Sequence, residues 1–226
     1  MKITVLGTGS VGRTLAGRLA ELGHEVTVGT RDAAATLERS APDNMGNPPY
    51  REWAAEHPAV RLADFAEAGA GAELFVNATS GEVSLAALEA VGAANLAGRI
   101  LLDPANPLDF SQGFPPSLFV KDTDSLGEQI QAAFPELKVV KALNTLTAAL
   151  MVEPRRLANG EHTVFVSGND EAAKATVTEL LASFGHTDVI DLGDITTARG
   201  TEMLLPIWLR LMGKFGNAEF NFKIVR

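Results

Sequence analysis

Short apolar runs alternate with amphipathic stretches along nearly the whole chain. Several of the apolar runs are continuous, as expected for strands that are buried on both faces of a sheet. The predicted strands are 2–6, 25–29, 60–62, 74–78, 100–103, 139–143, 163–167 and 189–192. The predicted helices are 11–22, 83–91, 125–134 and 170–184. Strands that alternate with helices in this way predict an α/β fold built on a doubly wound parallel sheet.

Two stretches depart from this alternation. Residues 40–58 are rich in Pro, Asn and Gly, and we interpret them as an insertion with one short helix around 50–56. Residues 105–119 form a proline-laden loop after a strand. A soft boundary near 145–160 divides the chain into a first domain, 1–150, and a small carboxy-terminal α/β domain, 151–226.

The composition is that of a globular protein with an acidic surface. The 226 residues are 46% hydrophobic and carry a net charge of −9, which argues against partners such as nucleic acid or an anionic membrane. The chain has no cysteine, so disulfides and thiolate metal sites are excluded. No charged-then-apolar leader precedes "MKITVLG", and the longest apolar run, "MLLPIWLRLM", is far shorter than the ~20 residues of a membrane span. We expect a cytoplasmic protein.

The first predicted strand runs into a glycine-rich turn. Gly7, Gly9 and Gly12 have G-x-G-x-x-G spacing and are followed by a helix with one apolar face. Gly7 permits a tight turn, Gly9 lets a pyrophosphate approach the backbone, and Gly12 lets helix and strand pack closely. The phosphates would sit on the positive end of the helix. The motif predicts a Rossmann dinucleotide site, with a purely structural glycine turn as the alternative.

The second predicted strand ends in "VTVGTRD", and its last residues predict which dinucleotide binds. Eighteen residues beyond Gly12, where an NAD-binding protein usually has an acidic residue, this chain has Thr30, followed by Arg31 and Asp32. Thr30 offers a hydroxyl to a 2′-phosphate and Arg31 a planar cation, whereas Asp32 is one position late and is expected to turn outward. We predict NADPH in preference to NADH. The alternative is that Arg31 is only a solvated charge at the end of a strand.

Titratable groups are scarce where the ligand should lie. Ligands of such sheets bind at the carboxyl ends of the strands. His24, His57, His162 and His186 each precede a predicted strand, so we expect them at the opposite edge as solvated turn residues. No pair of them has metal-ligand spacing, and the only tyrosine, Tyr50, lies in the insertion. The sequence therefore predicts neither a metal site nor a catalytic acid or base.

Three polar but nearly uncharged loops leave the carboxyl ends of predicted strands. They are "ATSGE" (78–82), "DPANP" (103–107) and "LNTLT" (143–147). We expect Ala78, Thr79, Ser80, Asn106, Asn144 and Thr145 to line the nicotinamide and its substrate, although ordinary turn chemistry would also explain these residue types. A site lined by uncharged polar residues suits a hydride transfer between two flat rings, because that reaction depends on the alignment of the rings more than on acid–base catalysis.

The chain resembles a known family at this point. "VLGTGSVGRTLAGRLAELGHEVTVGTR", "KVVKALNT" and the closing "GTEMLLPIWLRLMGKFGNAEFNFKI" look like the NADP oxidoreductases dependent on coenzyme F-420, a deazaflavin. The resemblance implies an NADP domain and a small carboxy-terminal domain, with the deazaflavin stacked on the nicotinamide between them. It implies contacts as follows: Thr8, Gly9, Ser10 and Val11 with the pyrophosphate; Thr30 and Arg31 with the 2′-phosphate; Thr79, Ser80, Ala105 and Asn106 with the nicotinamide.

"DPANP" and "KALNT" are also similar to the reductase domain of six-transmembrane metalloreductases, which pass hydride from NADPH to a flavin. The archaeal members of the F-420 family carry His where this chain has Asn144, and their second insertion is shorter than residues 32–59. The second substrate, coenzyme F-420 or a flavin, is therefore open. Lys121, Lys141, Arg199 and Lys214 are candidate partners for a polyanionic F-420 tail.

The carboxy-terminal segment 203–212 predicts a helix that is apolar almost all round. Thr196 or Thr197 would cap it, and Pro206 would kink it. Such a helix must be covered by its own core, by a second copy in a homodimer, or by the acceptor.

Three hypotheses follow for the whole chain: hydride transfer between NADPH and a deazaflavin or flavin, which we favour; NADPH-dependent reduction of a small carbonyl or imine, with a proton relay through Thr79, Ser80 or Lys121; and a non-catalytic NADPH-binding module.

Overall fold

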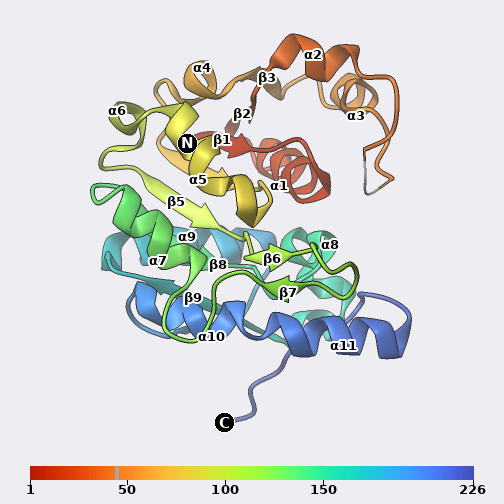
Figure 1. Cartoon of the computed structure of the whole chain (residues 1–226), viewed down its shortest axis with the longest axis vertical. Coiled ribbons are helices and arrows are strands. Elements are labelled where there is room, and N and C mark those ends of the chain that lie inside the picture. The colour runs from red at the N-terminus through yellow and green to blue at the C-terminus, as the bar shows by residue number, and fades with distance from the viewer. Residues whose placement is uncertain (44–45) are drawn as a thin grey trace.

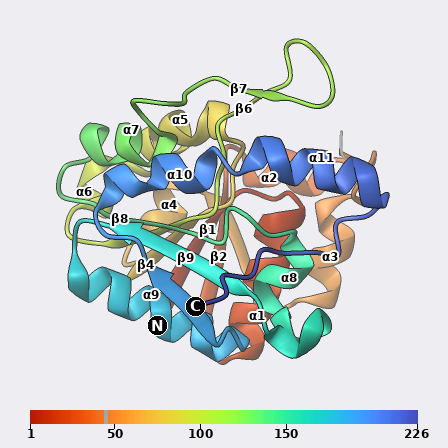
Figure 2. The ribbon, with the colours of Figure 1, turned by 90° about the horizontal axis from the view of Figure 1, so that it is seen from below.

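A computed structural model describes residues 1–43 and 46–226 as an eight-stranded, mostly parallel sheet between two layers of helices (Figures 1 and 2). The strand order is β10-β9-β8-β5-β4-β1-β2-β3. The strands are β1 (Lys2–Leu6), β2 (Glu25–Thr30), β3 (Arg61–Asp64), β4 (Leu74–Asn77), β5 (Ile100–Asp103), β8 (Lys138–Ala142), β9 (Thr163–Gly168) and β10 (Asp188–Asp191). All eight predicted strands are present, with ends that differ by at most two residues, and the α/β Rossmann class is confirmed.

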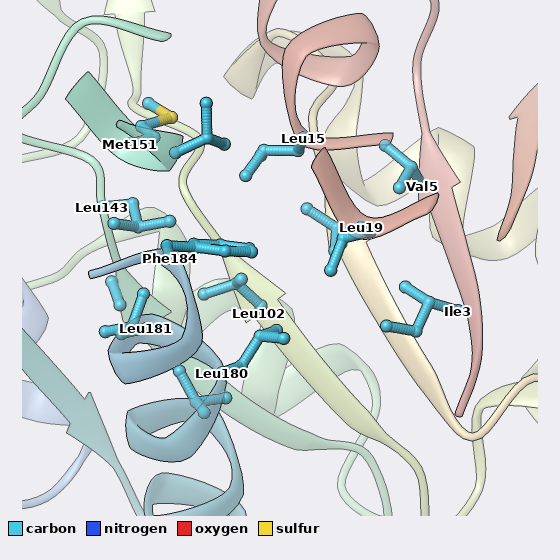
Figure 3. Packing of buried hydrophobic residues seen from close by; sticks show 14 of the residues in the cluster. Ile3, Val5, Leu15, Leu19, Leu102, Leu143, Met151, Leu180, Leu181 and Phe184 are labelled. Atoms are coloured by element: carbon cyan, nitrogen blue, oxygen red, sulfur yellow. The ribbon is translucent and has the colours of Figure 1, made fainter. Parts of the chain in front are cut away.

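Helices of one layer pack on the first apolar cluster of the core. They are α1 (Ser10–Glu21), α3 (Tyr50–Glu56), α8 (Ala148–Val152) and α9 (Glu171–Phe184). Figure 3 shows this cluster, in which Leu15 and Leu19 of α1 face Leu102 of β5, with Phe184 of α9 close by. Leu15, Leu19 and Leu102 are fully buried, and burying a side chain of this size stabilises the fold by roughly 1.5–3 kcal/mol. The apolar face predicted for the first helix therefore positions the glycine turn at its start.

The other layer covers the opposite face of the sheet. It contains α4 (Phe65–Gly69), α5 (Gly81–Val91), α6 (Ala93–Leu96), α7 (Leu126–Ala133) and, after the 3-10 turn η3 (Ile195–Thr197), α10 (Ala198–Glu202). The remaining helical elements are α2 (Ala33–Glu38), η1 (Pro154–Arg156), η2 (Ala158–Gly160) and α11 (Leu205–Phe215). A small hairpin of β6 (Leu108–Asp109) and β7 (Ser117–Leu118) occupies the proline-laden stretch that we had interpreted only as a loop.

The sheet is not parallel throughout. β9 pairs antiparallel with β8, where Val140 lies opposite Gly168 and Ala142 opposite Val166, and β10 then runs parallel to β9. β9 and β10 therefore begin at the edge where the other strands end. Apolar patterning cannot reveal this reversal, because a strand that is buried on both faces has the same sequence pattern in either direction. The last two strands extend the same sheet, and the domain division at residue 150 stays a prediction.

The carboxy-terminal helix differs from its prediction in three respects. It is two helices, because the chain turns between Glu202 and Leu205, and Pro206 lies in the first turn of α11, where its missing N–H is not needed. Asp194, rather than Thr196 or Thr197, provides the side-chain cap before η3, by accepting the Thr196 amide at 3.0 Å.

Helix α11 is also less buried than its composition indicated. Only Leu205 and Leu209 of this helix are buried, whereas Ile207 and Phe215 are 48% and 54% exposed. Burial in the chain's own core therefore does not account for Ile207 and Phe215. No helix in the described part of the chain is long and apolar enough to cross a bilayer.

Candidate functional site

The glycine turn between β1 and α1 is shaped by close backbone packing. Gly7 has a φ of +113°, and a Cβ atom there would lie 2.5 Å from the carbonyl oxygen of Ala78. A Cβ on Gly12 would overlap the carbonyl oxygen of Gly7. By contrast, a Cβ on Gly9 would meet no atom within 4 Å. Gly7 and Gly12 thus serve the fold, whereas the space at Gly9 is open to a ligand at the start of α1, where backbone N–H groups have no intrahelical acceptors.

A cavity of about 560 Å³ extends from this turn to the end of β2. Thr30, Arg31, Thr36 and Arg39 line it at the end of β2, and Phe65 and small residues of α5 also contribute to its lining. The guanidinium groups of Arg31 and Arg39 have no ion-pair or hydrogen-bond partner among residues 1–43 and 46–226. Two uncompensated cations in one cavity form a site for a dianionic group such as a phosphate.

The hydroxyl groups of Thr30 and Thr36 also line this end of the cavity, whereas the Asp32 carboxylate does not. The Thr30 and Thr36 hydroxyl oxygens are 3.1 Å apart, and the Thr36 hydroxyl donates to the carbonyl oxygen of Asp32 at 2.7 Å. The carboxylate of Asp32 accepts the Ala35 amide at 2.8 Å and caps α2. Asp32 therefore turns away from the cavity, as predicted, and serves the local fold.

A second cavity, of about 210 Å³, adjoins the first. Both are lined by Ala78, Thr79 and Ser80, so the two cavities meet at the loop that follows β4. Ala105 and Asn106, after β5, form the opposite wall, together with Phe110 of the hairpin. The two walls touch directly, because a Cβ on Gly81 would overlap the carbonyl oxygen of Asn106. Of the predicted residues, Val11 also lines this second cavity, and Ser10 lines a different one, beside α1 and α3.

Asn144 does not line either of these cavities. Its side-chain amide donates to Asn106 Oδ1 at 3.0 Å, and Asn106 Nδ2 donates to the carbonyl oxygen of Asn144 at 2.8 Å. Asn144 is only 4% exposed, and it follows Leu143, whose φ is +65°. The structure thus brings Asn106 and Asn144 together, with Asn144 behind Asn106.

Two of the four histidines are not the solvated residues that we expected. His162 and His186 are 3% and 4% exposed, and because β9 is reversed, both lie at the carboxyl edge of the parallel strands. Their Nε2 atoms contact the carbonyl oxygens of Pro154 (3.1 Å) and Met151 (2.9 Å), at the end of α8. Burial lowers the pKa of His186 to about 4, so this ring is neutral at pH 7. These histidines join β9 and β10 to α8.

Two of the proposed cations for an F-420 tail are already paired. Lys141 is 1% exposed, and its ammonium group lies 2.6 Å from Asp103 and 2.8 Å from Glu202. Burial by itself would lower the pKa of Lys141, but the two carboxylates raise it above its ordinary value, so the group stays charged. Arg199 donates to Glu128 at 2.8 Å. Neither Lys141 nor Arg199 is free to bind a ligand, in contrast to our expectation.

Thr36, Arg39 and Phe65 also line the larger cavity, although they are not among the residues predicted from the sequence. A signal for Arg39 was present: a second arginine one short helix beyond Arg31, without an acidic neighbour at (i, i+4) on that helix. Phe65 lines the cavity only because β3 and α4 lie next to β2, and the sequence alone did not show this. Within the described ranges, no three His, Asp or Glu side chains converge as metal ligands would.

Comparisons with known proteins indicate the family to which this chain belongs. Residues 2–107 match the family described as NADP oxidoreductase, coenzyme F420-dependent. A crystal structure of a candidate F420-dependent NADP reductase from Arthrobacter sp. FB24 is 67% identical, covers 100% of both chains and superposes with a TM-score of 0.96. The F420-dependent NADP reductase of Methanothermobacter marburgensis is 28% identical, over 93% of this chain and 92% of its own length. The metalloreductase STEAP3 of Rattus norvegicus is 32% identical over 92% of this chain, which spans 38% of that relative.

Proposed function

Since the chain belongs to the family of F420-dependent NADP oxidoreductases, we propose that it transfers a hydride between NADPH and the deazaflavin ring of coenzyme F420, with a flavin as the alternative acceptor. It is an NADP-dependent oxidoreductase with a Rossmann fold. The observation that carries the proposal is the pair of adjoining cavities: one has two arginines without a partner among the described residues, and the other has walls that are nearly uncharged.

The residues present fit NADPH. The larger cavity has the volume of a small-molecule site, and it offers an open backbone at Gly9 for a pyrophosphate. At its far end Thr30, Arg31 and Arg39 would hold the 2′-phosphate, and the absence of an acidic residue at position 30 removes the repulsion that favours NADH. Phe65 and α5 would form the slot for the adenine.

NADPH, when bound, would supply the hydride, and the chain's own task is to align two rings. In the proposal, Thr79 and Ser80 hold the nicotinamide from one side, and Ala105 and Asn106 border it from the other. The Thr79 hydroxyl donates to Asn77 Oδ1 at 2.7 Å, and the Asn106 amide is fixed by Asn144, so both walls are oriented before a ligand arrives. Preorganised walls reduce the ordering that the transition state requires. We assign no side chain as an essential acid or base.

The proposal extends to the rest of the chain. Residues 1–150 would bind NADPH, and residues 151–226 would complete the acceptor cleft. Two copies would form a homodimer through α11, because this helix exposes the apolar side chains of Ile207 and Phe215, which an interface would bury. We place the enzyme in the cytoplasm, with small-molecule partners and no nucleic-acid or membrane partner.

The test is a steady-state assay with NADPH against coenzyme F420, FMN, FAD and a panel of small ketones and imines. We expect F420 to be reduced with a kcat/KM at least tenfold above that of either flavin. Reduction of the carbonyl or imine panel without turnover of any ring acceptor would refute the proposal and support the alternative reductase. Tight NADPH binding with no acceptor turned over would also refute it and support a non-catalytic module.

A further inference from the structure

Asp103, Lys141 and Glu202 form a buried ion triad in the middle of the sheet. Lys141, on β8, lies 2.6 Å from Asp103 Oδ2 of β5 and 2.8 Å from Glu202 Oε1 of α10. The side chains of Asp103 and Lys141 are wholly buried, and that of Glu202 is 2% exposed. Charges of this kind are costly to bury, and apolar side chains of similar volume often stabilise a core as well or better. The triad therefore calls for an explanation other than stability.

The triad is bonded directly to the walls of the smaller cavity. Lys141 Nζ donates to the carbonyl oxygen of Ala105 at 2.8 Å, and Asp103 Oδ1 accepts the Ala105 amide at 3.2 Å. Both backbone polar groups of Ala105 are thus held by the triad. Asp103 Oδ1 also accepts from Asn77 Nδ2 at 2.9 Å, and Asn77 Oδ1 in turn accepts from the Thr79 hydroxyl at 2.7 Å. The loops after β4 and after β5 are connected through the same carboxylate.

Glu202 connects this network to the carboxy-terminal helices. Its two carboxylate oxygens accept the amides of Leu126 (2.9 Å) and Gly127 (3.1 Å) at the start of α7. The triad holds two carboxylates and one ammonium group, so one negative charge is in excess, and the positive end of α7 compensates it. Lys141 can satisfy both carboxylates and the Ala105 carbonyl only as a cation with three donors.

We propose that Lys141 is a positioning residue for hydride transfer: by holding Asp103 and the Ala105 carbonyl, it sets the spacing between the two loops that border the nicotinamide. This inference rests on the function proposed above. Alignment of reacting rings is sensitive to small displacements, and a shift of about 1 Å can reduce a rate by about a hundredfold. Lys141 itself touches neither cavity, so it would act only through Ala105 and Asp103.

The test compares Lys141→Met with a matched control, Lys174→Met. Lys174 is also a buried lysine, 4% exposed, that bridges two carboxylates, with Asp191 and Glu171 each at 2.8 Å. It joins α9 to β10, and within the described part of the chain it has no bond to the cavity walls. We expect Lys141→Met to slow single-turnover hydride transfer to F420 by about 10- to 100-fold. We expect its Kd for NADPH to stay within about twofold, because the phosphates bind elsewhere, and we expect Lys174→Met to transfer hydride at the wild-type rate.

Two further measurements keep the inference falsifiable. If Lys141→Met does not fold, the variant Asp103→Asn/Lys141→Met/Glu202→Gln removes all three charges while keeping the side-chain shapes, and it should show the same loss of rate. In addition, amide hydrogen exchange at Ala105 in the NADPH complex should be at least tenfold faster in the Lys141 variant than in wild type or in Lys174→Met. A folded Lys141 variant with the wild-type rate, or with unchanged protection of Ala105, overturns the inference.

Failure of the inference can be distinguished from failure of the proposed function. If the wild-type protein turns over neither F420 nor a flavin, the proposed function fails. Amide hydrogen exchange at Ala105 then still decides whether Lys141 fixes the loop that follows β5. If the wild-type protein turns over F420 and both lysine variants lose rate equally, the proposed function stands, and Lys141 contributes only to stability.

Discussion

Replacement of Arg31 by alanine tests the preference for NADPH most directly. Arg31 is exposed, lines the larger cavity and has no partner within residues 1–43 and 46–226, so its loss breaks no contact of the ligand-free protein. We therefore expect the free energy of unfolding to be unchanged. Any effect on NADPH then reports a contact that the cofactor makes with the guanidinium, and NADH, which lacks the 2′-phosphate, should not respond.

The magnitude follows from the surroundings of Arg31. A hydrogen bond to a charged group contributes about 1.5–3 kcal/mol, and solvent exposure places Arg31 at the low end of this range. A loss of about 1.4 kcal/mol corresponds to a tenfold increase in the Kd for NADPH. Arg39 shares the cavity and would retain part of the attraction, so the double variant Arg31→Ala/Arg39→Ala should lose about a hundredfold. The Kd for NADH should stay within about twofold in both variants.

Fluorescence titration with both nucleotides, at low and at high salt, is the assay. The matched control is Arg61→Ala, which removes an exposed arginine that pairs with Glu67 at 2.7 Å. Arg61 is the first residue of β3, so it lies at the amino-terminal end of the parallel strands, whereas Arg31 follows the carboxyl end of β2. The control should leave both dissociation constants unchanged. If Arg31→Ala weakens NADPH and NADH equally, or if wild type does not prefer NADPH, the assignment of this corner to the 2′-phosphate is wrong.

Three further predictions follow from the structure. Gly9→Ala should raise the Kd for NADPH at least tenfold in a titration without changing the melting temperature, because its methyl group would meet no protein atom. Gly12→Ala should destabilise the fold by about 1–3 kcal/mol or more in calorimetry, because its methyl group would overlap the carbonyl oxygen of Gly7. Because burial lowers the pKa of His186 to about 4, the unfolded chain takes up a proton below pH 6.5 while the folded protein does not, so the free energy of unfolding falls by about 3 kcal/mol as the pH drops toward 4. Urea denaturation at pH 7 and pH 4.5 should show a smaller loss of stability for His186→Gln than for wild type. Ile207→Glu should convert a dimer into a folded monomer in light scattering, and an unchanged mass would remove α11 from the interface.

Local patterns were enough to predict the parts of the fold that local physics decides. Strands buried on both faces appear as continuous apolar runs, and the one-sided helix α1 follows from the spacing of Leu15 and Leu19. The glycine spacing predicted which backbone approaches are tight, at Gly7 and Gly12, and which one is open, at Gly9. Each of these depends on residues that are close together in the sequence.

What the sequence did not show depends on strand direction and on distant contacts. The reversal of β9 leaves no signal in an apolar run, and it misplaced His162 and His186 in the prediction. Lys141 looked like a free cation because its partners, Asp103 and Glu202, are 38 and 61 residues away along the chain. Where Asn144 lies could not be deduced either, because its partner Asn106 belongs to a different loop.

Arg13 ties the inserted segment to the phosphate-binding turn. Its Nε donates to the carbonyl oxygen of Thr8 at 2.8 Å, one terminal nitrogen donates to that of Pro48 at 2.6 Å, and the guanidinium carbon lies 5.4 Å from the centre of the Tyr50 ring. Residues 46–58 are therefore anchored by a side chain that lies outside the insertion. A chimera that exchanges this segment between relatives has to transfer position 13 with it, because without Arg13 the transplanted segment loses its hydrogen-bonded link to the phosphate-binding turn and keeps only its packing on the core.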